Sequence, residues 1–121
     1  MPHRILVIDD DKAIRLGLED YFTQHGYHVD CAGTWEEAEA LLAAFSYPAV
    51  ITDLYFTDTQ RGDGLAIVDY AHARSPRTRT ILITAHGNPA IARQAQEHGV
   101  DVFLQKPFPL GVLLQHLAAL L

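Results

Sequence analysis

The sequence predicts an α/β fold: a doubly wound parallel sheet of five strands with five helices, forming one domain over residues 1–121. Short apolar runs alternate with longer segments of helical periodicity, which is typical of β-α-β units. Three of the runs are almost wholly apolar, as expected for strands covered on both faces. A chain of 121 residues with 49% hydrophobic residues also suits one globular core.

Five short apolar runs are the candidate strands. They span Arg4 to Ile8, Tyr27 to Cys31, Ala49 to Thr52, Thr80 to Thr84 and Val102 to Leu104. Right-handed crossovers would bring their carboxyl ends to one edge of the sheet, which is where ligands bind in open α/β folds.

The first two candidate helices follow the first two strands. The first, Lys12 to His25, is stopped by Gly26. Its apolar residues recur at helical spacing, at Ile14, Leu18, Tyr21 and Phe22. A capping box of Thr34 and Glu37 opens the second helix, which runs to about Phe45. We expect its inner face to consist of Ala38, Leu41, Leu42 and Phe45.

The remaining three helices are marked by glycine and proline. The third runs from Gly64 to about Arg74, and the fifth from Pro109 to Leu121. Asn88 as N-cap and Pro89 at the first helical position open the fourth helix, which Gly99 closes.

Polar side chains gather at the carboxyl edge of the predicted sheet. They are Asp9, Asp10 and Asp11 after the first strand, Asp53 after the third, Thr84 at the end of the fourth and Lys106 after the fifth. Carboxylates bind hard cations such as Mg2+. A cation and a lysine neutralise charge on a transferring phosphoryl group, and an aspartate can accept that group as nucleophile. This edge therefore suits metal-assisted phosphoryl transfer.

Six short motifs in a fixed order cover the whole chain. They are Ile5-Leu-Val-Ile-Asp-Asp-Asp11, Val50-Ile-Thr-Asp-Leu54, Asp63-Gly64-Leu65, Ile81-Leu-Ile-Thr-Ala85, Gly99-Val-Asp-Val-Phe103 and Lys106-Pro107-Phe108. With the helices between them, they resemble the receiver domains of two-component response regulators. The resemblance implies a flavodoxin-like sheet of strand order 2-1-3-4-5 and a phosphorylation-dependent signalling switch.

The resemblance also implies roles for the carboxylates. Asp53 would be the phosphoacceptor. Asp9, Asp10 and Asp53 would hold Mg2+ or Mn2+ together with the backbone carbonyl of Tyr55. Beyond self-phosphorylation and self-dephosphorylation, no enzymatic activity is implied.

The resemblance implies a switch on neighbouring strands. Thr84 would move toward the phosphoryl group, which Lys106 would pair with, and Phe103 would turn into the vacated space. The surface of the fourth helix, fifth strand and fifth helix would change as a result. A cis peptide is expected between Lys106 and Pro107.

One segment departs from the family pattern. From Leu54 to Gly64 the chain is longer than usual for the family, and Thr57 stands where a proline is common. We expect this loop to influence the choice of partner.

The implied partners are a sensor histidine kinase or a phosphotransfer protein, and an effector domain beyond Leu121. Because no charged residue follows Lys106, the fifth helix has few polar positions. We therefore expect a homodimer through the fourth and fifth helices.

Composition argues against several other classes. The net charge is −6 and the basic residues are scattered, so direct nucleic-acid binding is not expected. No apolar run approaches the length of a membrane span, and the single cysteine, Cys31, excludes an internal disulfide. We expect a cytoplasmic protein.

Three alternatives stay open at this point. Taken alone, Asp9 and Asp10 could be a helix N-cap cluster, the role to which Asp11 is assigned. The chain could be a small Mg-dependent phosphohydrolase of the haloacid dehalogenase type, although nothing after Lys106 is acidic. It could also be a receiver-like scaffold that never takes phosphate.

Overall fold

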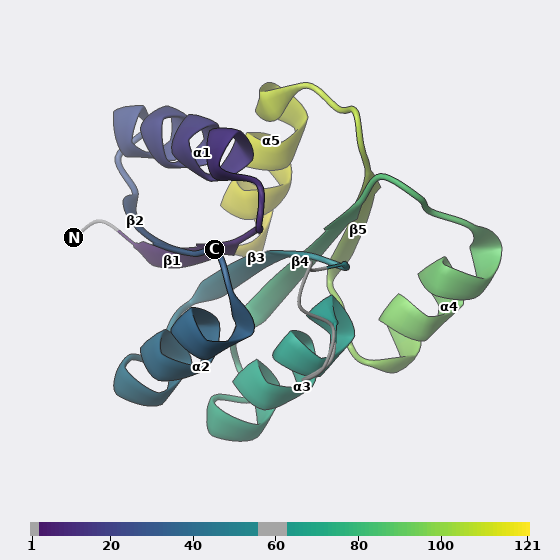
Figure 1. Cartoon of the computed structure of the whole chain (residues 1–121). Helices are drawn as coiled ribbons and strands as arrows, with labels where there is room; N and C mark the ends of the chain where they lie inside the picture. The colour runs from purple at the N-terminus through teal and green to yellow at the C-terminus, as the bar shows by residue number, and fades with distance from the viewer. Residues whose placement is uncertain (1–2, 56–62) are drawn as a thin grey trace.

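The fold is an open five-stranded parallel sheet with helices on both faces (Figure 1). The computed structural model describes residues 3–55 and 63–121. The elements alternate along the chain as β1 (Arg4–Ile8), α1 (Lys12–Gln24), β2 (His28–Ala32), α2 (Trp35–Ala44), β3 (Ala49–Asp53), α3 (Gly64–Arg74), β4 (Arg79–Thr84), α4 (Pro89–Glu97), β5 (Val102–Gln105) and α5 (Leu110–Leu120). The strand order is β2-β1-β3-β4-β5, which confirms the predicted fold class and topology.

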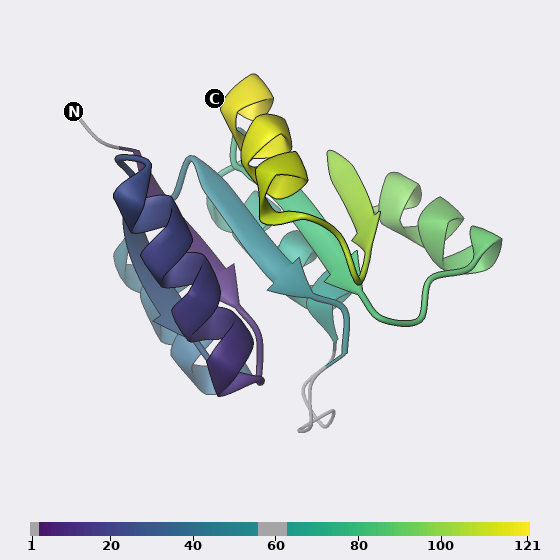
Figure 2. The same cartoon turned by 90° about the horizontal axis from the view of Figure 1, so that it is seen from above.

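Alternate residues of each central strand pack against opposite helical layers. Ile5 and Val7 of β1 pack with residues of α1 and α5, whereas Leu6 and Ile8 pack with residues of α2 and α3. These two pairs of helices lie on opposite faces of the sheet (Figure 1). All four side chains are buried, so β1 reads as a continuous apolar run. The strands point to the same edge of the sheet (Figure 2), and this parallel arrangement brings the residues that follow them together.

The second strand lies one residue later than the sequence predicts. It covers His28 to Ala32, because the backbone N–H of Tyr27 bonds to the carbonyl of Phe22 in the turn that ends α1. Ala32 is buried, and its carbonyl accepts from Asp9 N at 3.1 Å, which continues the pairing beyond β1. The first strand is confirmed from Arg4 to Ile8, and the third, fourth and fifth are each one residue longer than predicted.

The predicted helix caps are confirmed. Asp11 caps α1, Asn88 caps α4 with Pro89 behind it, and Oγ1 of Thr34 accepts from the backbone N–H of Glu37 at 3.1 Å. Gly99, which follows α4, has a φ of +79°, the left-handed conformation that glycine tolerates best.

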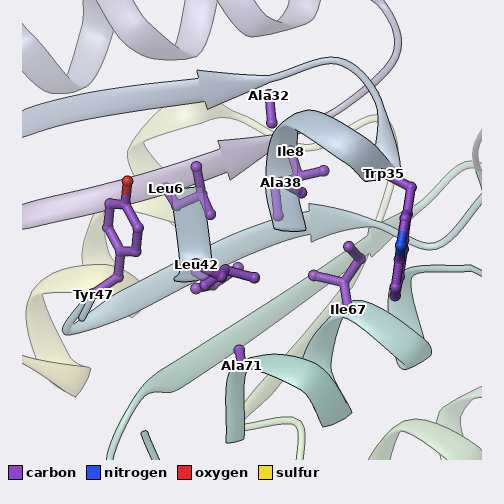
Figure 3. Packing of buried hydrophobic residues seen from close by; sticks show 10 residues of the cluster. Leu6, Ile8, Ala32, Trp35, Ala38, Leu42, Tyr47, Ile67 and Ala71 are labelled. Atoms are coloured by element: carbon purple, nitrogen blue, oxygen red, sulfur yellow. The ribbon is translucent and has the colours of Figure 1, made fainter. Parts of the chain in front are cut away.

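One predicted core residue of α2 is wrong. Phe45 is 41% exposed, because α2 ends at Ala44 and the backbone of Phe45 is already extended. Its ring lies 3.8 Å from the Arg4 guanidinium instead. Trp35, which the periodicity did not assign to the inner face, is the first residue of α2 and is buried in this core on the side of Ile67 (Figure 3).

A polar network closes the end of this core opposite Trp35. Figure 3 places Tyr47 at that end. Oδ2 of Asp30 accepts hydrogen bonds from Arg4 Nε and from Tyr47 Oη, each at 2.7 Å. Burial alone would raise the pKa of Asp30, but these hydrogen bonds outweigh it and hold the pKa below its ordinary value.

We expect Asp30→Asn to lower the free energy of unfolding at pH 7 by about 1–2 kcal/mol, since charge-assisted hydrogen bonds are lost. A lowered folded-state pKa stabilises the fold above the unfolded pKa, and this stabilisation disappears as pH falls through the folded value. The difference between variant and wild type in urea unfolding should therefore shrink below about pH 4. Asp20→Asn, at an exposed position of α1, is the control. A difference that does not change with pH would contradict the assignment.

Within residues 3–55 and 63–121, none of the helices has both the length and the apolar character needed to cross a bilayer.

Candidate functional site

Three carboxylates meet at the carboxyl edge of the sheet. Asp9 directly follows β1, and Asp53 is the last residue of β3. Because Ile8 pairs with Thr52, the two aspartates extend from neighbouring strands at the same level. One oxygen each of Asp9, Asp10 and Asp53 lies within 4.8 Å of the other two. The structure thus brings together the three residues that the sequence predicts as metal ligands.

Lys106 reaches this cluster from β5. Its Nζ lies 3.1 Å from Oδ2 of Asp9 and 3.5 Å from Oδ2 of Asp53. The backbone N–H of Lys106 donates to the carbonyl of Thr84 at 2.8 Å. This hydrogen bond continues the pairing of β4 and β5 and holds Lys106 next to the end of β4. The peptide between Lys106 and Pro107 is cis, as predicted.

The cluster is short of positive charge. Burial and the Asp9 carboxylate raise the pKa of Asp53, while Lys106 and the backbone N–H of Tyr55 act in the opposite direction. Burial alone would lower the pKa of Lys106, but its two carboxylate partners outweigh burial and raise the pKa, so the ammonium stays charged. One ammonium therefore does not balance three adjacent carboxylates.

This donor set fits a hard divalent cation. Carboxylate oxygens are the ligands that Mg2+ and Mn2+ prefer, and Mg2+ is commonly bound through one or two protein carboxylates with waters. Asp9 is only 3% exposed, and its two carboxylate oxygens accept from the backbone N–H of Asp11 and from Lys106 Nζ. Asp10 and Asp53 complete the set of carboxylates that could hold the cation. Whether the carbonyl of Tyr55 joins them stays a prediction.

The consecutive aspartates Asp9, Asp10 and Asp11, here called the acidic run, have different partners. Oδ1 of Asp11 accepts from Ala13 N at 2.9 Å and thereby caps α1. The backbone N–H of Asp11 donates to Oδ1 of Asp9 at 2.9 Å. The N-cap role therefore belongs to Asp11, as predicted, and Asp9 is turned toward Lys106 instead.

The predicted switch residues lie beside the cluster. Thr84 is fully buried at the end of β4, and its Oγ1 accepts from the backbone N–H of His86 at 3.1 Å. Phe103 of β5 pairs with Leu82 and packs, partly buried, against a small core with Leu54 and Ala95. Among the described residues, Thr84 Oγ1 forms no hydrogen bond with Asp53 or Lys106.

Two residues that shape the site were missed by sequence analysis. Gly64, the first residue of α3, lies so close to β3 that an added Cβ would collide with the backbone carbonyl of Asp53. Arg15 donates from Nη1 to the backbone carbonyl of Asp9 at 2.7 Å. A basic residue near a helix N-terminus is disfavoured by the helix dipole, and this could have signalled a specific partner for Arg15.

The lengthened segment between Leu54 and Gly64 is only described at its ends. Residues 56–62, including Thr57, lie outside the described residues. Leu54 is buried and Tyr55 is 46% exposed beside Asp53.

Comparison with known proteins matches the family model of the response regulator receiver domain to residues 5–118. The transcriptional regulatory protein PmrA of Pectobacterium parmentieri is 33% identical over 118 residues, which are 98% of this chain and 52% of that protein. The chain spans about half the length of the curated relatives that it matches.

Solved structures agree with this match. The beryllofluoride-activated NtrC4 receiver domain dimer is 33% identical, with a TM-score of 0.88 over 97% of this chain and 94% of that one. A response regulator protein from Burkholderia pseudomallei, solved with a phosphorylated aspartic acid, calcium ion and citrate, is 28% identical, with a TM-score of 0.87 over 95% of this chain and 66% of that one.

The family match covers nearly the whole chain and decides against a phosphohydrolase of the haloacid dehalogenase type. Together with the strand order and the acidic cluster facing Lys106, it identifies the chain as a member of the response regulator receiver domains, the signalling domains of two-component systems.

Proposed function

We propose that Asp53 accepts a phosphoryl group from a histidine kinase, a phosphotransfer protein or a small phosphodonor. Mg2+ or Mn2+ would be held by Asp9, Asp10 and Asp53, with the backbone carbonyl of Tyr55. The observation that carries the proposal is the convergence of three carboxylates with Lys106 Nζ at one sheet edge. The phosphorylated aspartic acid and calcium ion in the Burkholderia pseudomallei relative support it.

In the proposed step, a carboxylate oxygen of Asp53 attacks the phosphorus of the donor. A bond forms between this oxygen and phosphorus as the bond to the leaving group breaks, and the leaving group keeps the electron pair. An imidazole leaving group then takes a proton from solvent, whereas a carboxylate leaving group departs as the anion. Lys106 Nζ, which faces Oδ2 of Asp53, neutralises charge on the phosphoryl oxygens. A bound cation would supply further neutralisation of that charge.

The proposed signal is a shift between two packings. A phosphoryl group adds a charge of about −1.5 to −2 and strong acceptor oxygens at Asp53. Oγ1 of Thr84 accepts from His86 N, and its hydroxyl group can also donate one hydrogen bond, which the phosphoryl group would accept. Movement of Thr84 would open space for Phe103 and change the surface of α4, β5 and α5.

Intact mass spectrometry with Mg2+ and acetyl phosphate tests the function. We expect the mass of one phosphoryl group to be added to the wild type, and no addition in Asp53→Asn or in wild type with a chelator. Wild type that takes no phosphate under these conditions would favour the scaffold alternative.

Tyr55 is expected to slow hydrolysis of the phosphorylated domain, because its bulky side chain, 46% exposed and two residues past Asp53, would obstruct the attack of water on the phosphoryl group. Tyr55→Asn should release phosphate several-fold faster, measured as the decay of the phosphorylated mass. Tyr27→Asn, remote from the sheet edge, is the control. An unchanged decay in Tyr55→Asn would contradict the role.

We also propose that the phosphorylated domain forms a homodimer through α4 and α5. Leu110 of α5 is 38% exposed, and α5 carries no charged residue. The NtrC4 receiver dimer supports this proposal. Sedimentation with beryllofluoride should show a dimer, which Leu110→Glu weakens. A monomer at all concentrations would contradict it. Output through an effector domain beyond Leu121 is proposed from the greater length of the relatives.

A further inference from the structure

Arg15 is tied to the backbone of the acidic run. Its Nη1 donates to the carbonyl of Asp9 at 2.7 Å, across six residues from the first turns of α1. Within residues 3–55 and 63–121, Arg15 forms no ion pair with a carboxylate. The guanidinium therefore engages the backbone of Asp9 through a hydrogen bond.

Gly33, which follows β2, provides the space for this contact. A Cβ built on Gly33 would lie 2.5 Å from Nη1 of Arg15 and 2.9 Å from its Cζ. The backbone of Gly33 is not in the left-handed region, which Gly26 and Gly99 adopt among the glycines of residues 3–55 and 63–121. Gly33 thus leaves room for the guanidinium, the far end of a side chain that would have to shift if a Cβ stood at this position.

Every polar atom of Asp9 takes part in a hydrogen bond. Its N–H donates to Ala32, its carboxylate accepts from the N–H of Asp11 and from Lys106, and its carbonyl accepts from Arg15. The carbonyl of Asp9 belongs to the peptide that leads into Asp10. The Arg15 contact therefore fixes the orientation of that peptide, and with it the direction in which Asp10 leaves the backbone.

We propose that Arg15 is a positioning residue for the cation site, which it keeps in a binding geometry by holding the Asp9–Asp10 peptide, and that Gly33 is the clearance that permits this contact. The inference rests on the proposed metal-dependent function. It adds two residues, on α1 and after β2, that touch neither the cation nor the phosphoryl group.

The direction in which Mg2+ affinity changes when Arg15 is replaced distinguishes a positioning role from a direct electrostatic effect of its charge on the cation. The positive charge of Arg15 repels a cation, so a purely Coulombic role predicts tighter Mg2+ binding when the charge is removed. Positioning predicts weaker binding. Residues one contact removed from a metal ligand commonly change metal affinity by about 10- to 100-fold, and a backbone contact belongs at the lower end.

The test is a Mg2+ titration of the whole chain, followed by the amide chemical shifts of residues 9–11 and 53. We expect Arg15→Ala to raise the Mg2+ dissociation constant about tenfold. Arg15→Lys, which keeps a donor and the charge, should recover part of the affinity. Gly17→Ala on the same helix, where nothing lies within 4 Å of the added Cβ, should bind like wild type.

Gly33→Ala tests the same inference independently of any substitution at Arg15. It should weaken Mg2+ binding in the wild-type background but have no effect in the Arg15→Ala background, because its Cβ then meets no guanidinium. In phosphorylation by acetyl phosphate, the Mg2+ concentration for half-maximal rate should rise in both single variants. The rate at saturating Mg2+ should not change, since Asp53 and Lys106 are untouched.

The outcomes are distinct. If wild type binds Mg2+ and the dissociation constant of Arg15→Ala is equal to or smaller than that of wild type, the inference is wrong. The proposed function would still stand. Equal effects of Gly33→Ala in both backgrounds would also overturn the inference. A wild type that binds no Mg2+ would overturn the proposed function and the inference together.

Discussion

Replacing Lys106 by methionine is expected to destabilise the domain and to slow phosphorylation about 100-fold or more, which is typical of removing a charge-stabilising donor from a reaction site. Lys106 is the ammonium that faces Asp9 and Asp53, and the Asp9 carboxylate is almost fully buried. Without Lys106, adjacent carboxylates repel each other in a poorly hydrated site. Breaking such a pair by removing one partner costs about 3–5 kcal/mol when both are buried, and about 2–3 kcal/mol is expected here because Lys106 is partly exposed.

The loss should depend on Mg2+. A cation that binds the three carboxylates replaces part of the missing positive charge, so urea unfolding of Lys106→Met should gain more from Mg2+ than wild type does. Lys12→Met, at the exposed start of α1, is the matched control because the chain has no other lysine. Equal stabilisation of Lys106→Met and wild type by Mg2+ would contradict the account of the site's charge.

Gly64→Ala has the second largest expected effect. The added Cβ would collide with the Asp53 carbonyl and lie 2.9 Å from the Leu54 Cα, both of which are backbone atoms that cannot rotate away. Either α3 or the end of β3 must shift, which should lower the free energy of unfolding by about 1–3 kcal/mol. Because Asp53 would move with the strand, phosphorylation should slow as well.

Urea unfolding and the rate of phosphorylation measure the two effects. Gly17→Ala is the control, since its Cβ meets nothing within 4 Å and a helical alanine is favoured over glycine. A Gly64→Ala variant as stable and as reactive as wild type would show that α3 does not constrain the phosphoacceptor.

The sequence predicts the fold well because the pattern of β1 and the caps of the helices are local signals. Asp11, Thr34 and Asn88 bond to backbone groups within three residues, so their roles follow from short-range spacing. The prediction that Phe45 lies on the inner face of the second helix is wrong, because the apolar periodicity continues beyond the last residue of that helix. The helix ends at Ala44, after which the chain turns to enter β3.

Only the residues of the site that lie at the ends of parallel strands could be predicted from the sequence. Strand ends locate Asp9, Asp53 and Lys106 at one edge, and the structure brings them together. The contacts of Gly64 with β3 and of Arg15 with Gly33 join segments from different parts of the fold. They depend on how closely backbones approach, which no spacing rule in a single sequence encodes.

The central claim is that Asp53 carries the phosphoryl group. Its most direct test is to phosphorylate the chain with acetyl phosphate and Mg2+, reduce the acyl phosphate with borohydride, and locate the product by tandem mass spectrometry in the tryptic peptide bounded by Arg15 and Arg61. We predict homoserine at position 53 and aspartate retained at the other aspartates of this peptide, Asp20, Asp30 and Asp58. Homoserine at another aspartate, with Asp53 unmodified, would contradict it.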